Sequence, residues 1–396
     1  MTTQDPNNVG WVSEPTTRGT SSLLYTCIST TIICTWSALH LNVPREGLSA
    51  SRVLLYKIVG FMLAIIAPEY FVACAVGECF AAHRISKILA EILPGGRKWS
   101  HAFSHLISMR GVKLRLSTAP DAPEAILRIP DMIRFIEQGW IECEEFSIAA
   151  VQDKSKANPF NKTVASIQIF WFFSQLLGRL TSTIEISPLE WFTLAYVMCA
   201  FFMYGFWWYK PFDVQTPLLI YPDPSLSAEQ TLELKHSLPK CLKDRHKWND
   251  IGELLDLVPD KEELNTMTTR DRVWIDQLPI NKLFTIAIAI SIVLFGSCHL
   301  FGWNYPFPTT LETYLWRSAS ISCVCVPLTL LALAFLIPVG GLSGLWDMLE
   351  DYAWATLSII YVLVRLFLLF EVFFALRSSP PEIYKAVPWA QYLPHI

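Results

Sequence analysis

Long apolar stretches that are almost free of ionisable residues alternate along this chain with polar segments that carry nearly all of its charge. Charged residues make up only 17% of the 396 residues, whereas soluble proteins usually carry about 25%. A charged side chain in the middle of a bilayer costs several kcal/mol, so a membrane imposes this kind of distribution. The pattern therefore predicts an all-α, polytopic integral membrane protein whose first partner is the lipid bilayer.

The predicted membrane spans follow from the length of each apolar stretch. A helix needs roughly 20 mostly apolar residues to cross the hydrocarbon core. By this measure we predict about seven transmembrane helices, and we expect Pro68 to kink the second of them. The spans are expected at residues 22–43, 53–80, 164–183, 189–209, 283–303, 318–338 and 352–376.

Polar segments separate these spans into groups. We expect a polar N-terminal tail at 1–21 and a C-terminal tail at 377–396. Within the polar segment 81–163, apolar residues recur at helical spacing over 126–145, which predicts an amphipathic helix in the membrane interface. The whole chain is then organised as 1–21, spans at 22–80, a cytoplasmic segment at 81–163, spans at 164–209, a cytoplasmic segment at 210–282, spans at 283–376 and 377–396.

The distribution of Lys and Arg predicts how the chain sits in the membrane. With seven spans, the N-terminus would share one face with 81–163, 210–282 and the loop 339–351, and these segments hold most of the basic residues. Basic loops next to spans stay in the cytoplasm. We therefore expect the N-terminus in the cytoplasm and the C-terminus on the other side, in the endoplasmic reticulum or the plasma membrane.

Composition also argues against several classes of partner. The net charge is −4, and no basic stripe or recognition motif predicts a nucleic-acid partner. Most cysteines lie singly in apolar stretches, where they act as small hydrophobes. An acidic stretch at 249–260 has helical spacing that could hold Mg²⁺ and a diphosphate, but lysines precede it, and a solvated helix is the better interpretation. We expect no metal site, and the sequence identifies no cofactor.

Ionisable and amide groups in or beside the predicted spans are candidates for a functional site. Glu69 lies well inside the second span after Pro68, and a proline there frees a backbone carbonyl and bends the helix. Hydrogen bonds between helices are the structural alternative for each candidate. As catalytic groups we predict Glu69, Glu78 and His40, and as substrate-binding groups Asn42, Arg179, Lys210, Asp213 and His299.

Two arginines in the predicted spans should have partners on other helices. Arg179 lies at the end of a short span, and we expect its guanidinium to bond a carboxylate or backbone carbonyls nearby, because an unpaired one is costly. Arg365 and Glu371 are six residues apart and do not share a helix face, so Arg365 is also expected to find its partner elsewhere.

Several strings together are specific: CTWSALHLNVP (34–44), APE (67–69), VQDKSKANPF (151–160), WFFSQLLGR (171–179), WWYKPFDV (207–214) and CHLFGWNYPFPTTLETYLWR (298–317). Taken jointly, they resemble a large group of fungal multi-pass membrane proteins that is numerous in mushrooms. The resemblance covers most of the chain except about 225–270 and the last twenty residues. It implies a fungal integral membrane protein and supplies no activity. It highlights His40, Asn42, Glu69, Asp153, Lys154, Arg179, Lys210, Asp213 and His299.

Two functions follow as hypotheses. Aromatic residues reach 13%, and aromatic walls can line an apolar pocket and stabilise cationic intermediates. The first hypothesis is therefore a membrane-embedded enzyme in fungal specialised metabolism, which would use a carboxylic acid to cyclise or isomerise an apolar isoprenoid or lipid-like small molecule. The alternative is a transporter or channel for a small solute, although few glycines fall in the spans. A receptor or scaffold is a third possibility.

Overall fold

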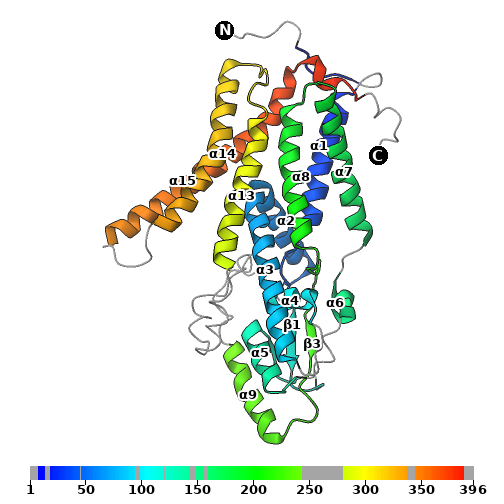
Figure 1. Cartoon of the computed structure of the whole chain (residues 1–396), viewed down its shortest axis with the longest axis vertical. Helices are drawn as coiled ribbons and strands as arrows, with labels where there is room; N and C mark the ends of the chain where they lie inside the picture. Colours follow the sequence, from blue (N-terminus) through cyan, green and yellow to red (C-terminus); the bar gives the residue numbers. More distant parts are fainter. Residues whose placement is uncertain are drawn as a thin grey trace.

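The computed structural model describes residues 8–13, 18–44, 46–93, 99–119, 121–141, 148–155, 159–242, 280–336 and 344–387. Helices form an elongated bundle, and a smaller unit lies at one end of it (Figure 1). The bundle consists of α1 (Thr20–Ala38), α2 (Ala50–Ile66), the first half of α3 (Pro68–Ile92), α7 (Pro159–Thr181), α8 (Pro188–Phe206), α13 (Ile280–Leu300), α14 (Thr310–Leu336) and α15 (Gly344–Phe374), followed by the 3-10 turns η4 (Ala375–Arg377) and η5 (Pro381–Tyr384).

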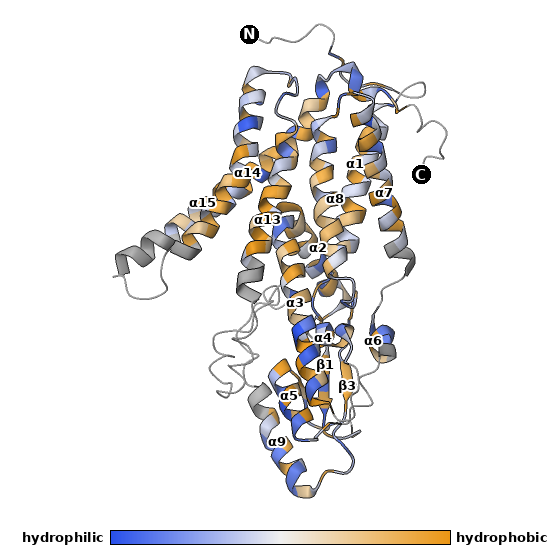
Figure 2. Cartoon of the chain, in the orientation of Figure 1, coloured by the Kyte–Doolittle hydropathy of each residue, from blue (hydrophilic) through white to orange (hydrophobic). Residues whose placement is uncertain are grey.

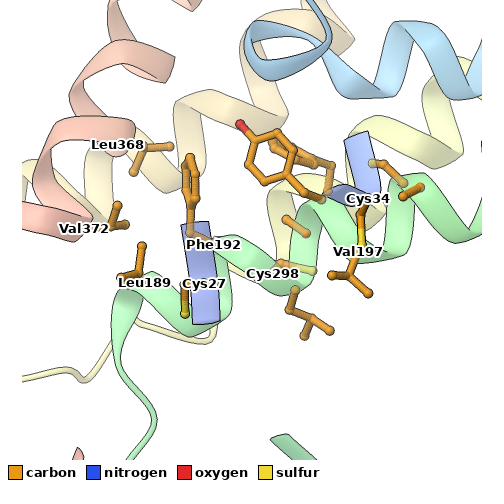
Figure 3. Packing of buried hydrophobic residues seen from close by; sticks show 14 of the residues in the cluster. Cys27, Cys34, Leu189, Phe192, Val197, Cys298, Leu368 and Val372 are labelled. Carbon is orange, nitrogen blue, oxygen red and sulfur yellow. The ribbon is translucent and has the colours of Figure 1, made fainter. Parts of the chain in front are cut away.

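The bundle is apolar inside and outside. In its core, Leu189 and Phe192 of α8 lie near Leu368 of α15 (Figure 3). On its outer surface, Phe170 and Phe370 are 72% and 71% exposed, and apolar residues dominate the bundle helices (Figure 2). An exterior of this kind is costly in water and fits contact with lipid chains.

The number of membrane spans differs from the prediction. Among the described residues, three helices are long and apolar enough to cross a membrane: Pro188–Phe206, Thr310–Leu333 and Tyr352–Arg377. The bent pair α2–α3 raises the number to four at most, so the prediction of about seven spans is wrong by this measure. The helix α1 is rich in Ser and Thr, and the described part of α13, Thr285–Leu300, is shorter than a span requires.

The smaller unit surrounds a core of its own. It contains the end of α3, α4 (His101–Ser108), β1 (Val112–Arg115), β2 (Glu124–Ile126), α5 (Ile129–Glu137), α6 (Ile148–Lys154), β3 (Leu218–Ile220) and α9 (Ala228–Leu242). Strand β1 is central, antiparallel to β2 and parallel to β3, with Lys113 opposite Ile126 and Val112 opposite Leu218. The chain is mainly helical, as predicted, and this small sheet is a departure from the all-α prediction. Three short strands carry too weak a local pattern to stand out in the sequence.

The predicted amphipathic helix over 126–145 is shorter and lies elsewhere. Ile126 belongs to β2, and α5 covers only nine residues. Its apolar residues Met132, Phe135 and Ile136 are buried in the core of the smaller unit. The apolar face is covered by protein rather than by the membrane interface, because it packs against α3 and joins the core of the smaller unit.

Helices α2 and α3 meet at a bend of 107°, which is far sharper than the kink expected at Pro68. Ala67 ends α2, and Pro68 begins α3, where its missing N–H costs nothing. Residues at the start of α2 and at the end of α3 both lie beside the smaller unit. The predicted second span therefore goes partway into the bundle and returns to the same end.

The two ends of the chain lie together. Val9 forms an antiparallel bridge with Ser379, and the Arg18 N–H donates to the carbonyl of Tyr384. These described segments near the two ends of the chain lie at the end of the bundle opposite the smaller unit (Figure 1). The prediction instead places the termini on opposite faces of the membrane, with the N-terminus beside 81–163. The bend between α2 and α3 accounts for the difference, because it brings the chain back to the end of the bundle from which α2 starts. The face of the membrane at which these segments lie stays a prediction.

The acidic stretch at 249–260 lies outside the described residues, and so does the loop 339–343.

Candidate functional site

A buried hydrogen-bond network lies at the bend between α2 and α3. Arg365 of α15 donates from Nε to the Ile66 carbonyl at 2.9 Å, and from Nη2 to the Ile65 carbonyl at 3.0 Å. Its Nη2 also lies 2.7 Å from the hydroxyl of Tyr196 on α8, which in turn donates to the Ile65 carbonyl at 2.6 Å. The last carbonyls of a helix have no partner within that helix. Arg365 and Tyr196 therefore satisfy the end of α2, and the expectation that Arg365 finds partners on other helices is confirmed.

Glu69 lies on the other side of the same bend. It is 4% exposed and occupies the first turn of α3, where the helix dipole favours a negative charge. The hydroxyl of Tyr361 donates to its Oε1, whereas its Oε2 has no hydrogen-bond partner among the described residues. The predicted candidate is thus a buried carboxylate held by one phenol.

His299 completes the network from α13. Its Nε2 lies 3.1 Å from Nη1 of Arg365, and the residue is fully buried. The ring stacks on Phe192 at 5.5 Å between centroids and lies 5.0 Å from Phe295. Phe295 also lies under the Arg365 guanidinium, 4.1 Å from its central carbon. An aromatic shell therefore surrounds the cation, as cation–π attraction favours.

A second polar group lies where the bundle meets the smaller unit. Lys210 Nζ is 2.6 Å from Oε2 of Glu78, and both side chains are more than 90% buried. The indole N–H of Trp207 donates to the same oxygen at 2.6 Å, and its ring lies 4.7 Å from Lys210 Nζ. Glu78 accepts from two donors in this arrangement. In this structure it is a carboxylate paired with Lys210, and its predicted catalytic role stays a prediction.

Two histidines lie beside this pair. His40 Nδ1 is 2.8 Å from the Ala38 carbonyl, which can only accept, so Nδ1 carries the proton. The His40 ring is 5.6 Å from Trp207 and 5.0 Å from Phe212. Burial, together with the nearby Lys210 charge, lowers the pKa of His105 on α4 to about 3. His105 is therefore neutral, and Lys210 and Glu78 are the charges at this position.

A cavity of about 300 Å³ opens on the far side of Phe212. We call it the junction cavity, because it lies between α1, α2 and residues 212–214. Its polar groups include Asn42 and an ion pair in which Lys57 Nζ is 2.5 Å from Oδ1 of Asp213. Asp213 has a φ of 52°, which few residues other than glycine adopt. The remaining lining residues are Trp36, Leu39, Leu41, Pro44, Val53, Tyr56, Phe212 and Val214.

Arg179 lies at the other end of the bundle, beside the chain termini. It donates to the carbonyls of Lys385 and Ile383 at 2.9 Å each and to that of Glu185 at 2.5 Å. Its Nε is 3.5 Å from Glu190, which Arg18 also binds at 2.7 Å. The expectation that Arg179 bonds carbonyls and a carboxylate is confirmed. Its partners fasten the C-terminal turn to the α7–α8 connection.

The structure thus divides the predicted residues among separate places. Glu69 and His299 share the network at the bend, whereas Glu78, His40 and Lys210 form the group behind the junction cavity. Asn42 and Asp213 line that cavity, and Arg179 is remote from all of these. Sequence reasoning missed Lys57, Tyr196, Tyr361 and Trp207. Of these four, only Lys57 could have been recognised from the sequence, because it is a charged residue within an apolar stretch.

Among the described residues, no group of three or more His, Cys, Asp or Glu side chains could hold a metal ion. The cysteines in these ranges are free, and most are buried in the bundle. The chemistry available at the junction cavity is therefore that of an ammonium, a carboxylate and an amide beside apolar walls.

Comparison with known proteins finds one family. No curated protein and no solved structure matches the chain. A family model described as "Family of unknown function (DUF8562)" matches residues 1–237. This match includes α1 to α8, the bend at Ala67, the junction cavity and most of the smaller unit. The chain therefore belongs to the DUF8562 family of unknown function.

Proposed function

We propose that this chain is a fungal multi-pass membrane protein that binds a lipid-like amphiphile in the junction cavity and acts on it as a membrane-embedded enzyme. The observation that carries the proposal is the composition of this cavity. Its volume of about 300 Å³ is at the lower limit of small-molecule sites. It would therefore hold the polar end of a ligand, and the remainder would lie outside.

Apolar surface continues from the cavity on two helices. Ile32 and Trp36 are exposed on α1, one helical turn apart, and Leu54 and Ile58 are exposed on α2. Trp36 itself lines the cavity, and the other three lie beside lining residues on the same helices. All four fit contact with hydrocarbon. An apolar tail could lie along either helix while the polar end reaches Lys57 and Asp213.

The charges indicate the kind of polar end. Lys57 is already neutralised by Asp213, and Lys210 by Glu78. An anionic headgroup would have to compete with Asp213 for its cation, and a cation would have to compete with Lys57. A neutral group that both donates and accepts hydrogen bonds, such as a hydroxyl, suits the intact pair. The ligand class is therefore a long-chain or isoprenoid alcohol. Lys57 and Asp213 are the groups within reach to exchange a proton with it.

A cavity-filling substitution tests this site. Val53→Trp is expected to weaken binding of a fluorescent long-chain alcohol at least about tenfold, because the indole occupies space that the headgroup needs. Leu55→Trp is the matched control, since Leu55 lies two residues further along α2, is 55% exposed and does not line the cavity. Binding is measured by fluorescence anisotropy with each protein in lipid nanodiscs. Equal affinities for the two variants would contradict the site.

A transporter is the second candidate, and one observation favours it. The break between α2 and α3, with a buried Glu69 and Arg365 at the freed carbonyls, has the form of the discontinuous helices that bind substrates in transporters. Chemical conversion of the alcohol in membranes containing the protein supports the enzyme. Flux of the unchanged compound between vesicle faces supports transport.

We also propose that the smaller unit faces the cytoplasm and that both termini lie on the opposite side, in the endoplasmic reticulum or the plasma membrane. Lys87, Lys154 and Lys210 lie at or near the smaller-unit end of the bundle, as positively charged cytoplasmic loops do. This proposal differs from the predicted cytoplasmic N-terminus. Val9 is paired with Ser379, so the segments near the two ends are expected on the same side of the membrane.

Glycosylation reporters test this arrangement. A reporter fused to either terminus is expected to be modified, because both would lie on the luminal or external side. A reporter inserted after Thr118, an exposed residue between β1 and β2, should stay unmodified. Modification of only one terminus would contradict the shared side, and modification at 118 alone would reverse the orientation.

A further inference from the structure

The contact between Arg365 and His299 determines the protonation state of the histidine. A guanidinium donates hydrogen bonds and accepts none, so Nε2 of His299 must be the acceptor at 3.1 Å. The imidazole is therefore neutral, with its proton on Nδ1. That Nδ1 is buried and has no hydrogen-bond partner among the described residues. A second proton would remove the acceptor and place two cations 3.1 Å apart.

Little in the surroundings could offset a charge on His299. Helix α13 packs against α3, α8 and α14, and the nearest rings are those of Phe192, Phe295 and Trp316. Of the charged groups described here, Arg365 repels an imidazolium, and Glu69 already accepts from Tyr361. The titratable groups that face this region from the packed helices are Glu69 (α3), Tyr196 and Cys199 (α8), Cys298 (α13), Cys323 (α14), and Tyr361 and Arg365 (α15).

Arg365 links this histidine to the end of α2. Its other donors hold the carbonyls of Ile65 and Ile66, the last residues of α2 before the bend. Helix α2 has few other anchors, since Gly60 and Ala64 are its only buried residues. Displacement of Arg365 would thus leave the Ile66 carbonyl without its donor and the Ile65 carbonyl with the Tyr196 hydroxyl alone.

We propose that His299 is a proton-binding site, and that a proton bound there separates Arg365 from the end of α2. In the closed arrangement the histidine is excluded from protonation by its bond to Arg365. In the open arrangement its ring is free to bind a proton, and an imidazole in contact with water does so near pH 6.5. Only the open arrangement takes up the proton. The ratio of open to closed protein therefore rises about tenfold for each pH unit below that value.

The proton site stands without the proposed function, but one consequence depends on it. Val53, Tyr56 and Lys57 of α2 line the junction cavity, so release of α2 would change that cavity. If the alcohol binds there, its affinity for the protein would then decrease as the pH is lowered. The experiment below measures α2 alone and at no point requires a ligand.

Hydrogen exchange of the full-length protein in lipid nanodiscs tests the proposal. Exchange at residues 60–67 is compared at pH 7.5 and pH 4.5, after correction for the intrinsic exchange rates. We expect exchange at these residues to become up to about 100-fold faster at pH 4.5, because this pH lies about two units below the pKa of an imidazole in water. Residues 192–200 of α8 are the internal reference and should stay protected. An unchanged rate at 60–67, or an equal rise in α8, would overturn the proposal.

Variants identify the group that binds the proton. His299→Gln keeps an oxygen that accepts from Arg365 and cannot bind a proton at these pH values, so it should abolish the response at 60–67. His101→Gln on α4 should retain it. A response that persists in His299→Gln would assign the proton to another group and refute the proposal. If that variant is not monodisperse, His299→Asn and the wild-type comparison of 60–67 with α8 still decide the outcome.

Discussion

Replacing Arg365 with methionine is expected to destabilise the protein by about 3–5 kcal/mol. The side chain is buried and donates to the carbonyls of Ile65 and Ile66 and toward Tyr196 and His299. Methionine fills similar space but offers no donor. The Ile66 carbonyl and Nε2 of His299 would be left buried without a donor, at about 1–3 kcal/mol each, whereas the Ile65 carbonyl keeps the Tyr196 hydroxyl. The measurement is the thermal unfolding midpoint in detergent, followed by intrinsic fluorescence.

The matched control is Arg317→Met. Arg317 donates to a single carbonyl, that of Trp303 at 3.0 Å, and is only half-buried. Its loss should cost about 1 kcal/mol or less. Arg365→Lys should be intermediate, because one ammonium cannot reproduce the fork of donors. If Arg365→Met unfolds at the same temperature as Arg317→Met, Arg365 does not hold the bend.

Removal of the cation in the Lys210–Glu78 pair is the second large effect. Lys210→Met should cost about 3–5 kcal/mol, because Glu78 would be left as a buried charge without its cation. The side chains are only 2% and 9% exposed, so water cannot replace the partner. The double variant Lys210→Met with Glu78→Met should recover most of the loss, since an apolar pair of similar volume is tolerated in such a position.

The exposed pair Lys385–Glu382 provides the comparison. Its nitrogen and oxygen are 3.4 Å apart, with side chains 61% and 46% exposed, so Lys385→Met should change stability by less than about 1 kcal/mol. The unfolding midpoints of the wild type, Lys210→Met, the double variant and Lys385→Met are measured in one detergent. A double variant as unstable as Lys210→Met alone would show that the loss comes from packing around Lys210 and not from the unpaired charge.

Some of this arrangement is readable from the sequence, because insertion into a membrane depends on local composition. The apolar stretches predicted at 189–209, 318–338 and 352–376 each coincide with a long apolar helix. A carboxylate beside a proline in an apolar stretch is rare, which makes Glu69 a candidate site residue, and it is indeed buried at a helix break. Arg179 and Arg365 were expected to have distant partners for the same electrostatic reason, and both have them.

The sequence could not place these groups relative to one another. Glu69 and Glu78 lie nine residues apart on the same helix, α3, yet one meets Tyr361 and the other Lys210. Lys57 and Asp213 form the polar end of the junction cavity from segments more than 150 residues apart. No periodicity records such pairs, because periodicity reports only which face of a helix is apolar.

The sequence by itself determined that this chain needs an apolar environment and where its charges must find partners, since both follow from the cost of placing polar groups in hydrocarbon. The tertiary structure alone decided that α2 and α3 turn back at Ala67, and hence that the two termini lie together. The physical reason is at the end of α2. Its carbonyls need donors, and these come from Arg365, 299 residues beyond Ile66 along the chain.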